Sequence, residues 1–368
     1  MLSPPTLRSR LAPGARPVFN QIPGVSRHGR APTLALLEAH QAMAELLTIR
    51  DLHVRFSKGN GRLVFALNGI SLRAREGEVV GILGESGSGK STLAKALLRL
   101  LPRTAHVAGD IQFVGRNTLQ LSECEMNQIR GARIALIPQE PGLALNPVLK
   151  IGDQVAEVLR VHRDWNWKRC KAEAQSALEQ VGLLAGAGRR FYDAYPHQLS
   201  GGQQQRAVIA QALVCEPALI IADEPTASLD TATEAQILDL FRELRAGRSS
   251  SLLFITHNPD LLRNFADRVA VLYAGRVVET KSVDSLFENT RHPYAKGLLA
   301  CVPAQAAKLA LGERLHTIGG MPADAETPTR GCSFAPRCNE RLDKCETRHP
   351  EMQEVNDAEA VECFLYGG

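Results

Sequence analysis

The sequence predicts an α/β fold, because short apolar runs of strand length alternate with stretches of helical periodicity. The clearest run, 79–83, leads into a glycine-rich loop at 84–92, and leucines then recur at helical spacing until Pro102. Two more apolar runs, 134–137 and 219–222, stand on either side of a long helical stretch. A strand, a glycine-rich loop and a helix in that order place the loop at the carboxyl end of a buried strand.

The loop has the composition of a phosphate-binding site. Four residues separate Gly84 from Gly89, Lys90 and Ser91 follow, and a helix beginning there points its positive end toward an anion. Lys90 adds charge to the β- and γ-phosphates of a nucleotide, and the Ser91 hydroxyl can ligate Mg²⁺. An ordinary turn would not account for both flanking elements. The residues expected to bind ATP here are Gly84, Glu85, Ser86, Gly87, Ser88, Gly89, Lys90, Ser91 and Thr92.

The first 42 residues differ from the rest of the chain in composition. Five arginines, no lysine, six prolines and one acid stand there, which favours disorder over a packed fold. Such a segment is either a transit peptide or an extension before the natural start. We favour a start at Met43, because residues 43–45 lead directly into a strand, and we expect 1–43 to be a disordered or non-native extension.

The remaining body is electrically neutral. Of the 43 basic residues five lie in 1–42, and of the 39 acidic residues one does, so the body carries 38 of each. Bulk electrostatic binding to nucleic acid is not expected of such a surface. No apolar run approaches the roughly 20 residues that span a membrane, so any membrane role is expected to be peripheral.

Strand patterns dominate the segment before the loop. Apolar residues alternate over 47–56, a glycine-rich turn follows, and two shorter strands are expected at 63–67 and 70–73. This predicts an antiparallel subdomain next to the nucleotide. Phe56 is the candidate for stacking on adenine and Phe65 the second choice, although core packing explains either ring equally well.

A helical insert is expected over about 140–215, directly after a strand that ends near Gln139. The amide of Gln139 can reach Mg²⁺ or an attacking water from there. By itself, one glutamine at a strand end is weak evidence for this role.

The insert contains a second expected anion site. Ser200 is a good helix N-cap, and Gly201 and Gly202 leave bare N–H groups at the start of a helix that continues through Gln203. If the two anion sites lie on separate lobes, they meet one phosphate only when two subunits face each other head to tail. Each subunit would then close the site of the other.

In order and spacing these motifs resemble the ATP-binding subunit of an ABC transporter, over residues 46–280. The resemblance implies that Asp223, which ends an apolar strand, holds Mg²⁺ together with Ser91 and Gln139. It implies that Glu224 polarises the hydrolytic water. Glu224, His257 and Gln139 are therefore the expected catalytic residues.

Two further segments complete the resemblance. Ser228–Asp230 resembles the D-loop that crosses the dimer interface, so Asp230 is expected there. Residues 254–257 resemble the switch segment, whose histidine, His257, would contact the γ-phosphate. Asn258 stands where many relatives carry aspartate, which puts a local hydrogen bond in doubt but not the assignment.

The C-terminal part of the sequence indicates which group of ABC ATPases the chain resembles most. Residues 291–299, Arg-His-Pro-Tyr-Ala-Lys-Gly-Leu-Leu, resemble the tail of the oligopeptide, dipeptide and nickel importer ATPases. The resemblance implies an ABC nucleotide-binding domain at 44–290 and an importer-type tail at 291–368.

Four cysteines cluster in that tail, with 5, 6 and 17 residues between them: Cys332, Cys338, Cys345 and Cys363. Four thiolates suit zinc or a [4Fe–4S] cluster equally by count. The surrounding residues resemble dipeptide-importer ATPases, some of which hold an iron–sulfur cluster, so we expect [4Fe–4S] ahead of zinc or free thiols. The cluster would staple a tail of low hydrophobicity, and redox sensing is a further possible role.

The expected architecture is therefore an α/β P-loop ATPase core with an antiparallel β-subdomain, a helical subdomain and a small metal-stapled extension. The resemblance implies an ATPase that energises peptide import, with nickel, another small solute or a soluble non-transport ATPase as alternatives. The implied partners are a second ATP-binding subunit, identical or a sister chain, two transmembrane permease subunits and, indirectly, an extracytoplasmic solute-binding protein. The implied location is the cytoplasmic face of a bacterial inner membrane.

Overall fold

The computed structural model describes residues 45–183, 191–227, 229–247, 250–263, 265–301, 317–327, 329–356 and 359–366. All of them belong to one unit, Met43–Gly368. The expected extension at 1–43 and Ser228 of the expected D-loop lie outside the described residues.

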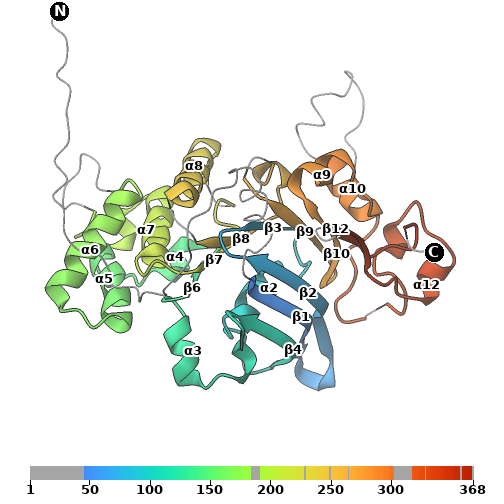
Figure 1. Ribbon diagram of the computed structural model, residues 1–368, viewed down its shortest axis with the longest axis horizontal. Helices are drawn as coiled ribbons and strands as arrows, with labels where there is room; N and C mark the ends of the chain where they lie inside the picture. The colour runs from blue at the N-terminus through green and yellow to red at the C-terminus, as the bar shows by residue number, and fades with distance from the viewer. Residues whose placement is uncertain are drawn as a thin grey trace, which may run out of the picture. The chain divides into compact units, whose positions relative to one another are not determined.

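An eight-stranded sheet forms the centre of the fold, in the order β11-β12-β10-β9-β3-β8-β7-β6 (Figure 1). The five strands from β9 to β6 run parallel, and the three at the other end pair antiparallel. The strands are β3 (Val79–Leu83), β6 (Ile134–Ile137), β7 (Leu219–Asp223), β8 (Ser251–Thr256), β9 (Arg268–Tyr273), β10 (Arg276–Ser282), β11 (Gln353–Asn356) and β12 (Glu359–Val361). The α/β prediction is confirmed.

The parallel strands are buried on both faces, because alternate side chains enter two different cores. On β3, Val80 and Ile82 pack into one core while Val79 and Leu83 pack into the other. The same alternation holds along β7 and β8. These strands therefore read as continuous apolar runs, and each ends where its side chains reach the edge of the sheet.

A second, antiparallel sheet covers one face of the central sheet. Its order is β2-β1-β4-β5, with β1 (Glu45–Ser57), β2 (Leu63–Arg75), β4 (Ala105–Phe113) and β5 (Arg116–Asn117). The sequence predicts separate strands at 63–67 and 70–73, but the structure has one continuous strand, because β2 pairs with β1 through register shifts that absorb the irregular residues. The antiparallel subdomain itself is confirmed.

Helices fill the space between the sheets and cover the opposite face. The α-helices are α2 (Lys90–Leu97), α3 (Glu123–Ile129), α4 (Pro141–Ala144), α5 (Ile151–His162), α6 (Trp167–Gln180), α7 (Gly201–Leu213), α8 (Thr231–Gly247), α9 (Val283–Glu288), α10 (Pro293–Ala300) and α12 (Lys344–Thr347). Short 3-10 turns are η1 (Gly59–Gly61), η2 (Thr118–Gln120), η4 (Pro196–Gln198), η5 (Pro259–Leu261) and η6 (Ala335–Arg337). Figure 1 shows α5, α6 and α7 together beside β6, where the helical insert is expected.

The C-terminal tail joins the central sheet at its other end. Within the tail, β12 pairs with β10 through Glu279↔Val361 and Thr280↔Ala360, and β11 pairs with β12. The backbone N–H of Glu362 also donates to the carbonyl oxygen of Val278 at 2.9 Å. The tail is therefore held by a β-ladder, which the sequence does not predict.

Candidate functional site

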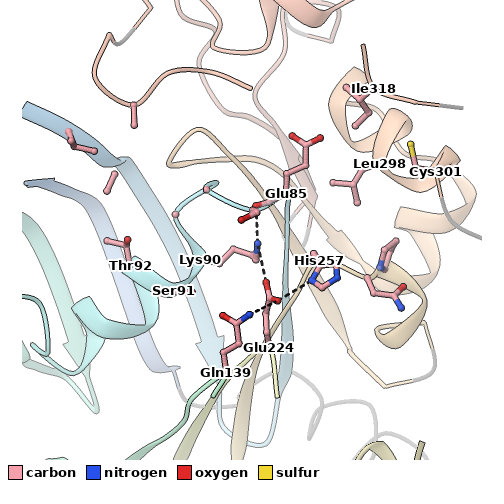
Figure 2. Close-up of a pocket in the computed structure, with 18 of the residues that line it drawn as sticks. Glu85, Lys90, Ser91, Thr92, Gln139, Glu224, His257, Leu298, Cys301 and Ile318 are labelled. Atoms are coloured by element: carbon pink, nitrogen blue, oxygen red, sulfur yellow. Dashed lines mark hydrogen bonds and ion pairs between the residues drawn. The ribbon is translucent and has the colours of Figure 1, made fainter. Parts of the chain in front are cut away.

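A cavity of about 1150 Å³ opens above the glycine-rich loop. The loop follows β3, and α2 begins at Lys90. Figure 2 shows the loop, Gln139, Glu224 and His257 around one space. The expected site residues that line the cavity are Phe56, Glu85, Ser86, Gly87, Gly89, Lys90, Ser91, Thr92, Gln139, Glu224 and His257. Gly84, Ser88 and Asp223 are buried around it.

Backbone sterics explain the last glycine of the loop. Gly89 has φ +107°, and a Cβ atom there would lie 2.8 Å from the carbonyl oxygen of Ala66. Side chains are disfavoured by both the dihedral angle and the contact. Within the described residues, the buried Ser88 Oγ has no hydrogen-bond partner, as expected of a loop built to bind an external acceptor.

Lys90 is held beneath the loop, with a side chain only 4% exposed. Its ammonium donates to the carbonyl oxygens of Gly84 at 2.8 Å and Glu85 at 2.9 Å, and lies 3.6 Å from Oε1 of Glu224. Burial lowers the pKa of Lys90, and the negative charge of Glu224 works against that shift. The lysine is thus a fixed positive charge at the base of the glycine-rich loop.

Ser91 and Asp223 place two oxygen ligands next to each other. The Ser91 hydroxyl donates to Oδ1 of Asp223 at 3.1 Å. Burial raises the pKa of Asp223, while the hydrogen bond from Ser91 lowers it. Hydroxyl and carboxylate oxygens are the ligands that Mg²⁺ prefers, so these residues fit a magnesium ion that also binds phosphate oxygens. Among the described residues, protein side chains alone form no metal site of three or more His, Cys, Asp or Glu.

The three expected catalytic side chains meet at one carboxylate. Oε2 of Glu224 lies 3.0 Å from Nδ1 of His257 and 3.5 Å from Nε2 of Gln139. Glu224 has φ +46°, and its N–H donates to the carbonyl oxygen of Ile255 at 3.0 Å. A left-handed non-glycine residue held by a neighbouring strand is typical of a functional site. The arrangement can polarise a water molecule near a bound phosphate.

The two aromatic candidates for base stacking are in different places. Phe56 is half-buried and lines the cavity together with Val64 and Ala66. Phe65 does not line it, and the Arg55 guanidinium lies 5.1 Å from the centre of its ring. The geometry favours Phe56, and its stacking on adenine stays a prediction.

The Ser200 turn begins α7 as a reciprocal cap. Ser200 Oγ accepts the N–H of Gln203 at 3.4 Å, and Oε1 of Gln203 accepts the N–H of Ser200 at 2.9 Å. A Cβ atom on Gly202 would lie 2.5 Å from Thr233 Cγ2, whereas one on Gly201 would meet no atom within 4 Å. Packing against α8 thus requires glycine at 202 but not at 201. No residue of 200–203 lines the cavity around Lys90.

Asp230 caps the start of α8, close to this turn. Its carboxylate accepts the N–H groups of Ala232 and Thr233 and the Thr233 hydroxyl, and these bonds lower the pKa of Asp230. The neighbouring switch segment has a similar local cap. Oδ1 of Asn258 accepts the N–H of Asp260 at 3.1 Å, so asparagine supplies a local hydrogen bond at this position.

The four tail cysteines line one small cavity next to His292 and Phe334. The N–H of Cys332 donates to the carbonyl oxygen of Cys345 at 2.8 Å. Burial raises the pKa of Cys332 to about 11 and raises those of Cys338 and Cys363. Among the described residues, these cysteines form no group with His, Cys, Asp or Glu that could hold a metal ion, and the [4Fe–4S] cluster stays a prediction.

The C-terminal tail also contributes to the cavity above the loop, which the sequence does not predict. Leu298, Ile318 and Ala325 line it, and Figure 2 shows Leu298 and Ile318 facing the loop near Glu85. The N–H of Phe65 donates to the carbonyl oxygen of Ala325 at 2.8 Å. The motif at 291–299 marks this segment as unusual, but nothing in its composition indicates contact with the loop.

Two family models match the chain. The model described as ABC transporter matches residues 67–227, and the model described as oligopeptide/dipeptide transporter, C-terminal region, matches residues 278–345. A dipeptide transport ATP-binding protein of Bacillus subtilis is 42% identical over 325 residues, which cover 88% of this chain and 95% of that protein. An oligopeptide transport ATP-binding protein of Mycobacterium tuberculosis is 42% identical over 323 residues, 88% of this chain and 52% of that protein.

Solved structures share the fold. A dimeric ATP-binding cassette in a post-hydrolysis state, bound to ADP and phosphate, has a TM-score of 0.58 and 30% identity over 64% of this chain and 98% of its own. A part of an ABC transporter complex from Clostridium perfringens has a TM-score of 0.56 and 28% identity over 67% of this chain and 91% of its own. None of the described helices is both long enough and apolar enough to cross a bilayer.

Proposed function

From the premise that this chain belongs to the family of ABC transporter ATP-binding subunits with an oligopeptide/dipeptide-type C-terminal region, we propose that it hydrolyses ATP to energise peptide import. The observation that carries the proposal is the meeting of Lys90, Gln139 and His257 at the carboxylate of Glu224, above a glycine-rich loop. The names of the relatives support a peptide as the transported solute.

Hydrolysis uses residues that the sequence already indicates. Water attacks the γ-phosphorus, the bond to the β–γ bridging oxygen breaks, and ADP leaves with its new charge facing Lys90. Glu224 orients the water and takes its proton, and His257 holds the carboxylate in place. Ser91 and Asp223, with Gln139, would hold Mg²⁺, which neutralises phosphate charge when bound.

Closure of the site needs a second ATP-binding subunit, identical or a sister chain. The turn at 200–203 does not line the Lys90 cavity, and Gly201 is exposed, with no atom within 4 Å of the position that a Cβ atom would take. A dimeric cassette among the structural relatives supports association of two subunits, and we propose that they face each other head to tail. ATP bound at Lys90 of one subunit would then contact the Ser200 turn of the other, and hydrolysis would reopen the pair.

The helical segment after Gln139 is the proposed contact with two transmembrane permease subunits. Leu143 is 82% exposed and Val148 is 75% exposed, which is unusual for apolar side chains so near a catalytic residue. Replacing both with aspartate should leave ATP binding intact and abolish capture of the permeases. We propose that the subunit acts at the cytoplasmic face of a bacterial inner membrane, with a solute-binding protein as an indirect partner.

Uptake by reconstituted vesicles tests the function. The chain, co-purified with its permeases and partner ATPase, should drive ATP-dependent uptake of a labelled dipeptide, and a Glu224→Gln version should not. Uptake of nickel without peptide would support the metal-importing alternative. Purification as an active dimer that captures no permease would overturn transport and favour the soluble ATPase class.

We further propose that the four tail cysteines hold a [4Fe–4S] cluster, within a tail domain of 291–368 that follows the nucleotide-binding domain of 44–290. All four line one cavity, which supports a shared group. Four thiolates match the ligand set of a [4Fe–4S] cluster, and the same number also suits one zinc ion. Anaerobic purification with iron and sulfide analysis tests this, and stoichiometric zinc without iron would overturn it.

A further inference from the structure

The C-terminal tail forms hydrogen bonds with the phosphate-binding loop at Glu85. The guanidinium of Arg337 donates to both carboxylate oxygens of Glu85, at 2.8 and 3.1 Å. The backbone N–H of Glu85 donates to the hydroxyl of Tyr294 at 2.9 Å. Arg337 and Tyr294 lie 252 and 209 residues away in the sequence, so both contacts are tertiary.

Arg337 is itself fixed. Its side chain is 4% exposed, Nε donates to the carbonyl oxygen of Gly319 at 3.0 Å, and Nη2 donates to that of Ile318 at 3.3 Å. A planar guanidinium with a two-point carboxylate partner has little freedom to reorient. Tyr294 is fully buried, and its ring packs against Tyr273 with centroids 4.5 Å apart.

The backbone of Glu85 helps to fix the conformation of the loop. Its carbonyl oxygen accepts the N–H of Ser88 at 3.2 Å, which closes the first turn of the loop. The same oxygen accepts the ammonium of Lys90 at 2.9 Å. A shift of Glu85 would therefore move both the turn that presents N–H groups to phosphate and the lysine that carries the charge.

We propose that Arg337 and Tyr294 are positioning residues for the phosphate-binding loop, acting through Glu85. The importer-type tail is thus part of the nucleotide site, in addition to any role as a separate module. This inference rests on the proposed function in one respect, namely that the loop binds ATP. We call the contacts of Arg337 and Tyr294 with Glu85 the brace. Because the loop holds phosphates before and during hydrolysis, the brace should affect affinity for ATP more than turnover.

Steady-state kinetics of the full chain in its transport complex test the brace. Arg337→Gln should raise KM for ATP about tenfold, as expected for loss of a hydrogen-bonded charge, and change kcat less than about twofold. Tyr294→Phe, which keeps the buried ring, should raise KM several-fold in the same way. Glu85→Gln alone removes the charge of the same ion pair, and two amides can pair in Arg337→Gln/Glu85→Gln, so the double variant should have a KM no higher than that of Arg337→Gln. Arg341→Gln is the control, since Arg341 is exposed and pairs only loosely with Glu346 at 3.9 Å.

Failure of the proposed function and failure of the brace give different results. If the wild-type complex does not bind ATP, the proposed function fails and the brace is not at issue. If it does, wild-type KM values in folded Arg337→Gln and Tyr294→Phe would overturn the brace, as would a double variant whose losses simply add. Thermal unfolding shows which variants are folded, and Tyr294→Phe decides the matter if Arg337→Gln does not fold.

Discussion

Nδ1 of His257 lies 3.0 Å from Oε2 of Glu224, and this contact joins the carboxyl ends of β8 and β7, which are neighbours in the central sheet. Parallel strands bring their ends to one edge, so residues 33 positions apart become partners. Glu224 thereby has a polar neighbour on either side, because Gln139 follows β6. A water between this carboxylate and a bound phosphate would be oriented by residues at the ends of three strands, namely Glu224, His257 and Gln139.

Glu224→Gln should lower the ATPase rate at least about 100-fold, because an amide cannot accept the proton of the attacking water. ATP binding should persist, so the variant should accumulate as an ATP-bound dimer. Phosphate release and light scattering measure the two effects. Glu243→Gln, at an exposed position of α8, is the control. Normal turnover in the Glu224 variant would mean that another group acts as the base.

Gly201→Asp should prevent ATP-driven dimerisation without unfolding the subunit. A Cβ atom at 201 would meet no atom within 4 Å, while a carboxylate there would repel the phosphates of the nucleotide bound by the other subunit. Dimer formation in the Glu224→Gln background, followed by gel filtration, checks this. Gly59→Asp also enters open space, on η1, and should dimerise normally. A Gly201→Asp chain that still dimerises with ATP would remove the turn from the interface.

Phe56→Ala should weaken ATP binding by about 1–3 kcal/mol, the usual contribution of an aromatic ring stacked on a base. Phe56→Tyr should restore binding, since the ring is retained. Phe65→Ala is the matched control, because this ring packs against Arg55 and lies outside the cavity. Equal losses from both alanine variants would indicate a packing role for Phe56. Fluorescent ATP-analogue titration gives the affinities.

Cys338→Ser should reduce the protease resistance of the tail more than the ATPase rate at saturating ATP. The cysteine lines the tail cavity together with the other three and lies outside the catalytic contacts of Glu224. Limited proteolysis followed by mass spectrometry locates the cuts. Cys124→Ser, at an exposed cysteine outside the tail, should behave as wild type. Equal resistance in both variants would exclude a stapling role.

Acid should destabilise the protein through His292. Burial, with help from Lys296, lowers the pKa of this histidine from 6.5 to about 3, so its folded form stays neutral where the unfolded chain takes up a proton. The contribution of neutral His292 to the free energy of unfolding is complete above pH 6.5 and is lost as the pH falls toward 3. The loss is about 2 kcal/mol at pH 5.

His292→Asn isolates this effect. Nδ1 of His292 accepts the N–H of Tyr294 at the start of α10, and asparagine can accept the same bond without titrating. The free energy of unfolding should then fall less between pH 7 and pH 5 than in the wild type. Chemical denaturation at the two pH values measures the difference, and an unchanged drop would show that other groups cause the acid sensitivity.

Local motifs account for what the sequence predicts well. The loop up to Lys90, the Ser200 turn and the Asp223–Glu224 pair are each contiguous, and their chemistry depends on residue types a few positions apart. The apolar strands that precede them are buried on both faces, so their position at the carboxyl edge of the sheet follows from topology. Catalytic candidates could therefore be identified without coordinates.

By itself, then, the sequence determined the glycine-rich loop before α2, the carboxylates of Asp223 and Glu224 at the end of β7 and the family to which the chain belongs. Only the tertiary structure decided that Arg337 reaches Glu85, that Gly202 must be glycine because Thr233 packs against it, and that β12 continues the central sheet. Such contacts join segments far apart in the chain. They depend on how whole elements pack, and no periodicity or local spacing encodes that packing.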